Sequence, residues 1–253
     1  MIYITGDCHG NFSKFSTDAF PEQKQMTRDD FVIVCGDFGL WHDSKEERWW
    51  LKWLSEKPFT ILFVGGNHEN YDRLYSDEFS VVGFYGGKAQ KIRENIYYLM
   101  RGEVYTLCGK KFFCFGGALS HDIKDGILDK ANFVDDNDFR DEIRLWHKEN
   151  KQFRINHVSW WKEELPTQEE MDYGVKNLKK HKNEVDFIVT HCAPNHINSY
   201  FSSHFYKPNI LTKYLDDISK SVWFKKWFFG HYHDNQNILD KYVLLYEQII
   251  RIA

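Results

Sequence analysis

The sequence predicts one large α/β domain. Three observations lead to this prediction: short apolar runs rich in β-branched residues, longer segments with helical spacing between them, and polar residues where several apolar runs end. Continuous apolar runs of about four to eight residues are typical of strands buried on both faces. Because ligands bind beyond the strand ends of open α/β sheets, these polar residues are expected to share one crevice.

The apolar runs and the helical segments alternate along the chain. Buried strands are expected at residues 2–5, 31–35, 59–64, 187–190 and 223–229. Helices are expected at residues 11–20, 44–56, 169–182 and 211–220. The stretch 81–116 alternates strand-like segments with glycine-containing turns, which predicts hairpins.

Length and composition indicate a single packed unit. A chain of 253 residues with 42% hydrophobic and 17% aromatic residues can bury a sizeable core and is not disordered in bulk. We therefore expect residues 1–253 to form one domain. The charged segment at about 122–166 is expected to be an excursion over the surface or the mouth of a site, since long connections in compact domains are usually functional.

Charge and cysteine content restrict the class of protein. A formal charge of −4 argues against a protein that coats nucleic acid through phosphate contacts alone, although a nucleic-acid-binding module or a nuclease remains an alternative. Five cysteines without C-x-x-C spacing do not suggest a disulfide framework, so we expect a cytoplasmic location. We expect no membrane partner, because no secretory signal and no apolar stretch of ~20 residues is visible.

Short polar motifs at the predicted strand ends combine carboxylate, amide and imidazole groups with adjacent glycines. They are Gly6-Asp7-Cys8-His9-Gly10, Gly36-Asp37, Gly66-Asn67-His68-Glu69, Thr190-His191 and Gly230-His231-Tyr232-His233. Metal-assisted hydrolysis needs such ligands together with a proton donor. Residues two apart on an extended chain face the same side, which would pair Asp7 with His9, and His231 with His233.

Together and in this order, the motifs closely resemble those of the calcineurin-like metallophosphoesterase superfamily, over nearly the whole chain. The resemblance implies a four-layer α/β/β/α sandwich, in which two mixed sheets are flanked by helices and a dinuclear metal site lies at one edge. It implies one metal bound by Asp7, His9 and His233, a second bound by Asn67, His191 and His231, and Asp37 as the bridge.

The resemblance also implies the chemistry. The expected reaction is hydrolysis of a phosphomonoester or phosphodiester, in a nucleotide-like or small-molecule substrate, by attack of a metal-bridged hydroxide. His68 would protonate the leaving oxygen; the alternative is a purely hydrogen-bonding role. Nitrogen and oxygen ligands without thiolate favour two divalent ions of Mn, Fe or Zn over Ca or Mg. Cys8, Cys35 and Cys192 flank ligand positions but are expected to point into the core.

One further site residue and two alternative functions stay open. Arg101 is a candidate for binding the substrate, because a guanidinium can contact phosphate through two hydrogen bonds; an exposed strand-end arginine is the alternative. A protein Ser/Thr phosphatase is the alternative enzyme, but Gly36-Asp37-Phe38-Gly39 lacks the Asp-Arg-Gly of that branch. A non-catalytic metal-binding scaffold of the same fold is the alternative outside the enzymes, although every ligand position is filled.

Overall fold

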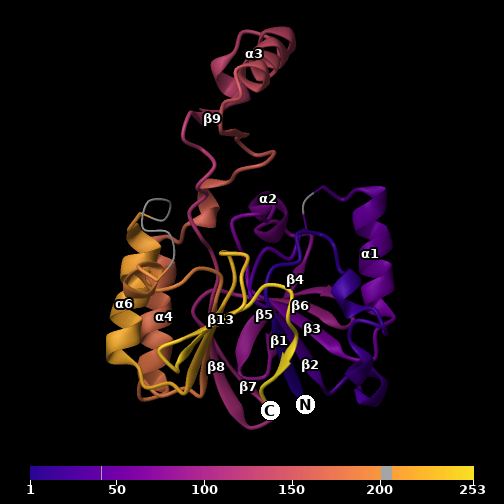
Figure 1. Cartoon of the computed structure of the whole chain (residues 1–253), viewed down its shortest axis with the longest axis vertical. Coiled ribbons are helices and arrows are strands. Elements are labelled where there is room, and N and C mark those ends of the chain that lie inside the picture. The colour runs from indigo at the N-terminus through magenta and orange to yellow at the C-terminus, as the bar shows by residue number, and fades with distance from the viewer. Residues whose placement is uncertain (41, 201–206) are drawn as a thin grey trace.

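The computed structural model describes residues 1–40, 42–200 and 207–253. In these ranges two large mixed sheets pack face to face, with helices on both outer faces (Figure 1). The strand order is β15-β1-β2-β3-β6-β5-β4 in the first sheet and β13-β14-β12-β11-β8-β7 in the second. This arrangement confirms the predicted four-layer α/β/β/α sandwich.

The first sheet is parallel at its centre. Its strands are β1 (Ile2–Thr5), β2 (Phe31–Val34), β3 (Thr60–Phe63), β4 (Ser80–Phe84), β5 (Gly87–Arg93), β6 (Ile96–Leu99) and β15 (Ile250–Arg251). Strands β1, β2, β3 and β6 are parallel neighbours, whereas β15 pairs antiparallel with β1 at one edge and β5 with β6 toward the other. The ends of β1, β2 and β3 therefore lie side by side.

The second sheet repeats this pattern. Its strands are β7 (Glu103–Leu107), β8 (Lys110–Phe115), β11 (Phe187–Thr190), β12 (Lys226–Phe229), β13 (Gln236–Ile238) and β14 (Tyr242–Leu244). Strands β8, β11, β12 and β14 are parallel neighbours, and β7 and β13 close the two edges in antiparallel pairing. The ends of β11 and β12 are thus neighbours as well.

Alternation along the central strands creates separate layers of core. Ile2 and Ile4 of β1 lie between the two sheets, in one cluster with Phe112 and Val189 of the second sheet. Tyr3, between them in the sequence, packs on the outer side of the first sheet. Because both faces of these strands are buried, their sequences read as continuous apolar runs, which is why the strands were predictable.

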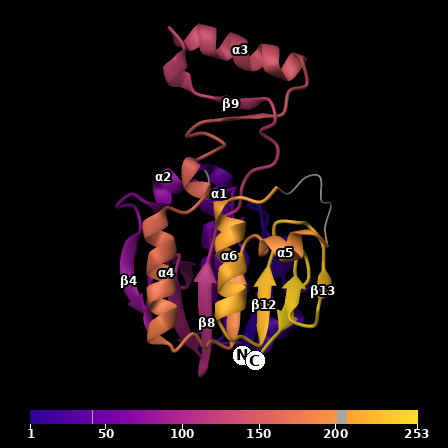
Figure 2. The same cartoon turned by 90° about the vertical axis from the view of Figure 1, so that its left-hand side faces the viewer.

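Three long helices cover the outer faces of the sheets. Helix α1 (Lys45–Ser55) lies on the first sheet, and α4 (Gln168–Lys180) and α6 (Ile210–Ser221) lie on the second (Figure 2). Their starts agree with the predicted starts within two residues, because polar caps mark them. The shorter helices are η1 (Ser13–Phe15), η2 (Pro21–Gln25), α2 (Tyr71–Leu74), η3 (Lys130–Asn132), η4 (Lys162–Glu164) and α5 (Asn195–Asn198). No helix in the described ranges is long and apolar enough to span a membrane.

The helix predicted at residues 11–20 is wrong. That segment contains one 3-10 turn, η1, and otherwise irregular chain. The side-chain amide of Gln23 donates hydrogen bonds to the carbonyls of Phe15, Ser16 and Phe20, at 3.1, 3.0 and 2.7 Å. A side chain from the following turn thus satisfies backbone groups that a helix would have satisfied internally.

The predicted hairpin region is divided between the two sheets. Strands β4, β5 and β6 complete the first sheet, and β7 and β8 begin the second. The change of sheet occurs at Met100–Gly102, where Gly102 has a φ of +77°. A glycine is required there, because an added Cβ would lie 2.8 Å from Cα of Gly174 on α4.

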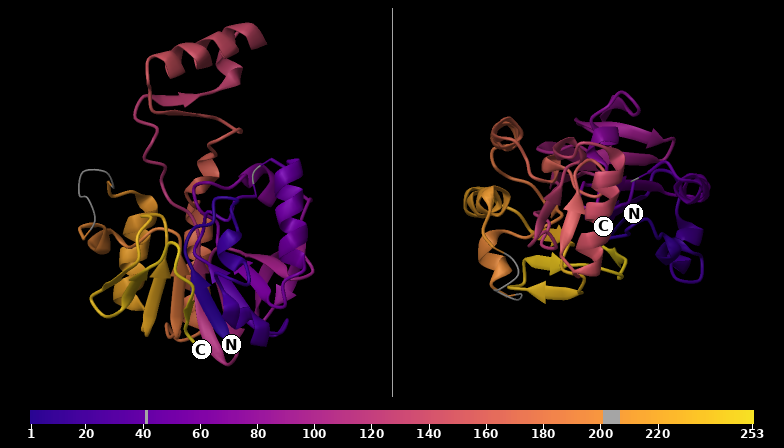
Figure 3. Two further views of the ribbon diagram at one scale, coloured as in Figure 1. Left: turned by 45° about the vertical axis from the view of Figure 1, so that its right-hand side comes forward. Right: turned by 90° about the horizontal axis from the view of Figure 1, so that it is seen from above.

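Between β8 and α4 the chain leaves the sandwich and projects beyond it (Figure 3). This arm carries β9 (Gly126–Leu128), helix α3 (Asp136–Lys148) and β10 (Phe153–Ile155), and β9 pairs in parallel with β10. The arm lies within the segment 122–166 expected as an excursion. Its root lies at the sheet edge where the strands β1, β8 and β12 end (Figures 1 and 2).

Candidate metal centre

All seven predicted ligand residues follow directly on parallel strands. Asp7, Asp37 and Asn67 come after β1, β2 and β3 of the first sheet, and His191 comes after β11 of the second. His231 and His233 follow β12, and His9 lies two residues beyond Asp7. The two facing sheets therefore contribute to one site at their common edge, as expected for ligands beyond strand ends.

One cluster joins the first and last motifs of the chain. His233 Nε2 lies 3.2 Å from Asp7 Oδ2 and 3.0 Å from His9 Nε2. His9 Nε2 lies 3.6 Å from the same carboxylate oxygen. These three side chains each offer a donor atom within 4.8 Å of the others, which is close enough to bind one cation.

A second cluster is more deeply buried. His191 Nε2 lies 3.2 Å from Asn67 Oδ1 and 3.3 Å from Asp37 Oδ2. The His231 ring lies beside that of His191, with 5.0 Å between the ring centroids. The side chain of Asp37 lies between the two clusters, since its Oδ2 is also 3.8 Å from His9 Nδ1. The structure thus brings together every residue of the predicted ligand set.

The backbone at these positions differs from the extended geometry that the sequence suggested. His9, Asp37, His231 and His233 all have positive φ, at 49°, 46°, 69° and 51°. The pairing of Asp7 with His9 therefore comes from a tight turn, not from strand alternation. Such left-handed conformations in non-glycine residues cost on the order of 1–3 kcal/mol each and are concentrated at functional sites.

The sheets approach so closely that glycine is required next to the ligands. A Cβ added to Gly36 would lie 2.2 Å from His191 Nδ1, and one added to Gly66 would lie 1.9 Å from Asp37 Oδ1. Neither contact is sterically allowed. These two glycines therefore let His191 and Asp37, from different sheets, come within range of a shared cation.

The local charges favour anionic carboxylates, and they shift the pKa values of the two buried imidazoles in opposite directions. Burial alone would raise the pKa of Asp37, but the neighbouring histidines, His191 above all, hold it well below its usual value. Burial opposes ionisation of His191, yet Asp37 and Asp7 raise its pKa to about 9 overall. Burial lowers the pKa of His231 to about 3. Two buried carboxylates among imidazoles create the negative potential that a divalent cation neutralises.

Partners outside the cluster orient the ligands. His191 Nδ1 lies 2.8 Å from the carbonyl oxygen of Cys35, and since a carbonyl only accepts, Nδ1 carries the proton and Nε2 faces the site. The Asn67 amide donates through Nδ2 to Ser120 Oγ at 3.4 Å, and Ser120 Oγ in turn donates to Glu164 at 2.6 Å. These hydrogen bonds direct Asn67 Oδ1, the atom predicted to bind metal, toward His191.

Glu69 has a structural role that the motif did not reveal. Its buried carboxylate accepts hydrogen bonds from the backbone N–H groups of Phe38, Gly39 and Leu40, at 2.6, 3.3 and 3.3 Å. Burial raises the pKa of Glu69 to about 8 despite these bonds. The three contacts fix the loop that follows Asp37, and with it the position of the carboxylate between the clusters.

His68 contacts the arm through Arg154 of β10. The guanidinium nitrogens of Arg154 lie 2.9 Å from His68 Nε2 and 3.2 Å from His68 Nδ1. Asp122 holds the same guanidinium through two hydrogen bonds, at 2.8 and 2.7 Å. Burial lowers the pKa of His68 to about 4, Asp37 opposes this, and the charge of Arg154 adds to it. Sequence reasoning missed Arg154, because nothing in the run Phe153–Ile155 signals that it returns to His68.

Arg101 does not face this site. Its side chain is buried, and its guanidinium donates to the carbonyl oxygens of Gly116 and Glu163 at 2.9 and 2.7 Å. It also lies 3.2 Å from a carboxylate oxygen of Glu170 and contacts the hydroxyl of Tyr71. With these internal partners Arg101 ties the sandwich to the segment before α4, which corrects the expectation that it binds phosphate.

The cysteines beside the ligands point away from the site, as expected. Cys8, Cys35 and Cys192 are buried, and each belongs to a different hydrophobic cluster. Burial raises the pKa of all three thiols. Thiolate ligation is therefore disfavoured, and the donor set consists of nitrogen and oxygen.

The donor chemistry and the close approach of the two carboxylates to four imidazoles fit divalent cations. A site of this composition at the edge of two facing sheets is typical of metal-dependent hydrolases. The chain belongs to the calcineurin-like phosphoesterase family, whose model matches residues 1–235. Membership confirms the predicted family; the activity, the identity of the metals and the cytoplasmic location stay predictions.

Similar proteins include two curated relatives. Lariat debranching enzyme A of Xenopus laevis is 28% identical over 152 residues, which cover 53% of this chain and 27% of that protein. The human lariat debranching enzyme is 28% identical over 142 residues, which cover 49% of this chain and 24% of that protein. The chain thus spans about a quarter of the length of these relatives. The phosphopantetheinyl hydrolase of Mycobacterium tuberculosis superposes with a TM-score of 0.48 at 15% identity, over 97% of this chain and 89% of that one.

Proposed function

We propose that this protein hydrolyses a phosphate ester at a dinuclear metal centre. The observation that carries the proposal is the convergence of seven nitrogen- and oxygen-bearing side chains that follow five strands of two sheets. Asp7, His9, Asp37, His191 and His233 fall into groups whose donor atoms lie within 4.8 Å of one another. Asn67 Oδ1 lies 3.2 Å from His191 Nε2, and the ring of His231 lies beside that of His191. Asp7, His9 and His233 would hold one cation, and Asp37 would be shared with the second. The other residues of the second site are Asn67, His191 and His231.

The chain's own residues then have distinct tasks. When bound, two divalent cations supply Lewis acidity toward phosphate oxygens and lower the pKa of water. His68 is the proposed donor of the proton to the leaving oxygen, because its backbone is fixed by the Asp37 carboxylate and its ring lies next to that of His9. Buried Ser120 and Glu164 keep the Asn67 amide in the orientation that binds metal.

We further propose that Arg154 contacts the substrate phosphate. A phosphate bound beside His68 gives the Arg154 guanidinium an anionic partner, and such charge-assisted pairs are strong. The same anion would favour protonation of His68, whose pKa is lowered by burial and by the charge of Arg154 in its absence. Asp122 restrains the guanidinium through two hydrogen bonds, so little conformational freedom is lost on binding. This assignment gives Arg154 the role that the sequence suggested for Arg101.

Arg154→Ala is expected to raise KM for a phosphate ester roughly 10- to 100-fold, the value of a hydrogen-bonded charge pair, with a smaller effect on kcat. Arg154→Lys should recover part of the loss, because it keeps the charge but not the planar fork. Arg144→Ala is the matched control, since Arg144 lies on α3 of the same arm and is paired with Asp141. Steady-state kinetics would measure these changes in KM and kcat. An unchanged KM in Arg154→Ala would contradict the proposed contact between Arg154 and the substrate phosphate.

The proposed function is tested by chelation and reconstitution. After exhaustive metal removal the protein should hydrolyse neither p-nitrophenyl phosphate nor its bis-ester, and activity should return with Mn²⁺, Fe²⁺ or Zn²⁺. Comparing the two esters separates phosphomonoesterase from phosphodiesterase activity. Because the curated relatives are named as lariat debranching enzymes, RNA is a sensible third substrate to include. Full activity in the chelated protein would refute the proposal.

A further inference from the structure

We infer that Tyr246 positions His233 for the cation that His233 would share with Asp7 and His9. The inference rests on the proposed function and adds a positioning residue to its metal centre. The rings of Tyr246 and His233 are stacked, with 4.7 Å between their centroids and 20° between their planes. Aromatic rings pair favourably in stacked arrangements at such separations. Tyr246 follows β14 in the C-terminal segment, outside all the motifs that the sequence marked.

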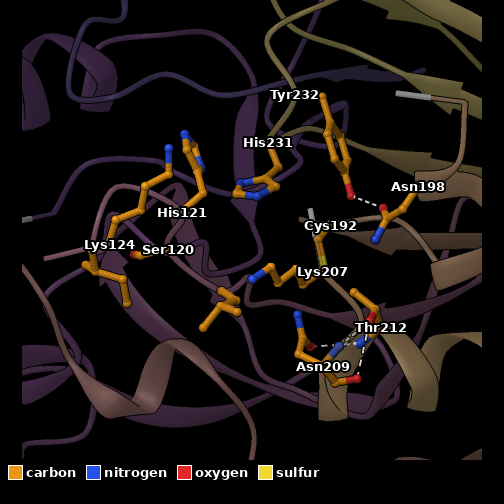
Figure 4. Close-up of a pocket in the computed structure, with 12 residues that line it drawn as sticks. Ser120, His121, Lys124, Cys192, Asn198, Lys207, Asn209, Thr212, His231 and Tyr232 are labelled. Carbon is orange, nitrogen blue, oxygen red and sulfur yellow. Dashed lines mark hydrogen bonds between the residues drawn. The ribbon is translucent and has the colours of Figure 1, made fainter. Parts of the chain in front are cut away.

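The two histidines of the last motif have different surroundings. His231 is buried, and with Tyr232 it lines a pocket of about 310 Å³ (Figure 4). The side chain of His233 is 50% exposed, so the protein interior does not fix the orientation of its ring. Because ordering an exposed side chain on binding costs conformational entropy, a ring that is held in advance binds a cation more tightly. The stacked ring of Tyr246 restricts His233 in this way.

The stack does not compete for the ring nitrogens of His233. Its Nε2 lies 3.2 Å from Asp7 Oδ2 and 3.0 Å from His9 Nε2. A stacked ring contacts the face of the imidazole, whereas metal binding and hydrogen bonding use the nitrogens at its edge. The contact therefore holds the plane of the ring while Nε2, the atom expected to bind metal, is directed at the other two ligands.

The backbone of Tyr246 is fixed to the backbone of Asp7 by a lysine. The ammonium group of Lys14 donates to the carbonyl oxygens of Asp7 and Tyr246, both at 2.7 Å. It also donates to the carbonyl oxygen of Gly6 and to the hydroxyl oxygen of Thr5, both at 3.3 Å. Hydrogen bonds from a charged donor are strong, so Lys14 holds the Tyr246 segment against the end of β1. One side chain thus links a predicted ligand to the residue that orients another.

A second support for Tyr246 comes from the loop that carries His233. Asn235 lies two residues beyond His233, and its Oδ1 accepts from the backbone N–H groups of Tyr246 at 2.9 Å and Gln248 at 3.3 Å. The N–H and the carbonyl group of Tyr246 are therefore both hydrogen-bonded, one to Asn235 and the other to Lys14. With its backbone held from two directions, Tyr246 offers His233 a preorganised surface.

Titration of the metal-free protein with Mn²⁺ tests this role, with free Mn²⁺ measured by electron paramagnetic resonance. The wild-type chain is expected to bind two Mn²⁺. In Tyr246→Leu the dissociation constant of one of the two cations should rise about 10- to 100-fold, as when a metal ligand loses an orienting partner. Tyr246→Phe keeps the ring and should bind both cations like the wild type. Tyr173→Leu removes a tyrosine ring from α4, on the outer face of the second sheet, and is the control.

Two further variants identify the affected cation and guard against misfolding of Tyr246→Leu. Because Tyr246 acts through His233, adding Tyr246→Leu to His233→Ala should cause no further loss of Mn²⁺ affinity. Asn235→Ala removes one support of Tyr246 at an exposed position and should weaken binding of the same cation by a smaller factor. Asn237→Ala, at an exposed position of β13, is its matched control.

The possible outcomes distinguish this inference from the proposed function. If two Mn²⁺ bind with the expected dependence on Tyr246 but no phosphate ester is hydrolysed, the proposed function fails and the role of Tyr246 stands. A wild-type chain that binds no Mn²⁺ would overturn both. Unchanged affinity in folded Tyr246→Leu or in Asn235→Ala, an equal loss in Tyr246→Phe, or a further loss on the His233→Ala background would each overturn the role of Tyr246 alone.

Discussion

Asp37→Asn is expected to remove one of the two cations and to lower kcat by about 10³-fold or more, because a bound metal ion contributes several kcal/mol to the transition state. Asp37 is the carboxylate that reaches toward both clusters, at 3.8 Å from His9 Nδ1 and 3.3 Å from His191 Nε2. Without its charge, the second cluster keeps only neutral ligands. The measurement is metal content per protein by elemental analysis, alongside kcat.

Asparagine is the informative replacement at this position. It tolerates the positive φ of 46° better than most residues, and its carbonyl oxygen can still accept the hydrogen bond from the backbone N–H of His68. The fold should therefore persist, which circular dichroism and a thermal unfolding curve would verify. Two metals bound with wild-type affinity in Asp37→Asn would show that the carboxylate is not the bridge.

His68→Ala is expected to lower kcat by ~10²–10⁴-fold while both metals remain bound. The metals should remain because the contact from residue 68 to the Asp37 carboxylate, at 2.8 Å, comes from the backbone N–H and not from the ring. The loss should be greater for phenyl phosphate than for p-nitrophenyl phosphate, since p-nitrophenolate needs less protonation as it leaves. Steady-state kinetics with the two esters would measure this difference.

This comparison of leaving groups separates proton donation from the purely hydrogen-bonding role. If His68 only positioned the phosphate, both esters would lose activity equally. His42→Ala is the matched control, because His42 lines the same cavity as His68 and Arg154 but is not assigned to the chemistry. An unchanged kcat in His68→Ala would remove the residue from the mechanism.

The strands, and the polar motifs that follow them, were predictable from the sequence because the signals are local. Runs such as Phe31–Val34 are buried on both faces and end at a polar residue, so the sequence marks both the strand and the site. The proximity of Asp7 to His233 was predicted from the family resemblance and not from the spacing of the residues. The sequence also predicted that the side chains of Asp7 and His9 face the same way, on the assumption of an extended strand. In the structure a turn at His9, with a φ of 49°, brings them together instead.

The parts that sequence did not predict depend on partners outside the segment concerned. Segment 11–20 has helical spacing, yet Gln23 binds the carbonyls of three of its residues. Arg101 and Arg154 both lie in or next to short strand-like segments. Only the tertiary structure shows that their side chains have different surroundings. Arg101 meets Glu170 and backbone carbonyls in the interior, whereas Arg154 returns from the arm to His68. No local pattern distinguishes these two environments.

The order in which the ligands occur along the chain has a consequence for biosynthesis. His9 and His233 are 224 positions apart, yet their Nε2 atoms lie 3.0 Å from each other. With the proposed ligands, a nascent polypeptide cannot assemble either cation site until the region around His231 has emerged from the ribosome. Metal loading would then follow synthesis of that region, and a chain truncated before it would lack ligands for both cations.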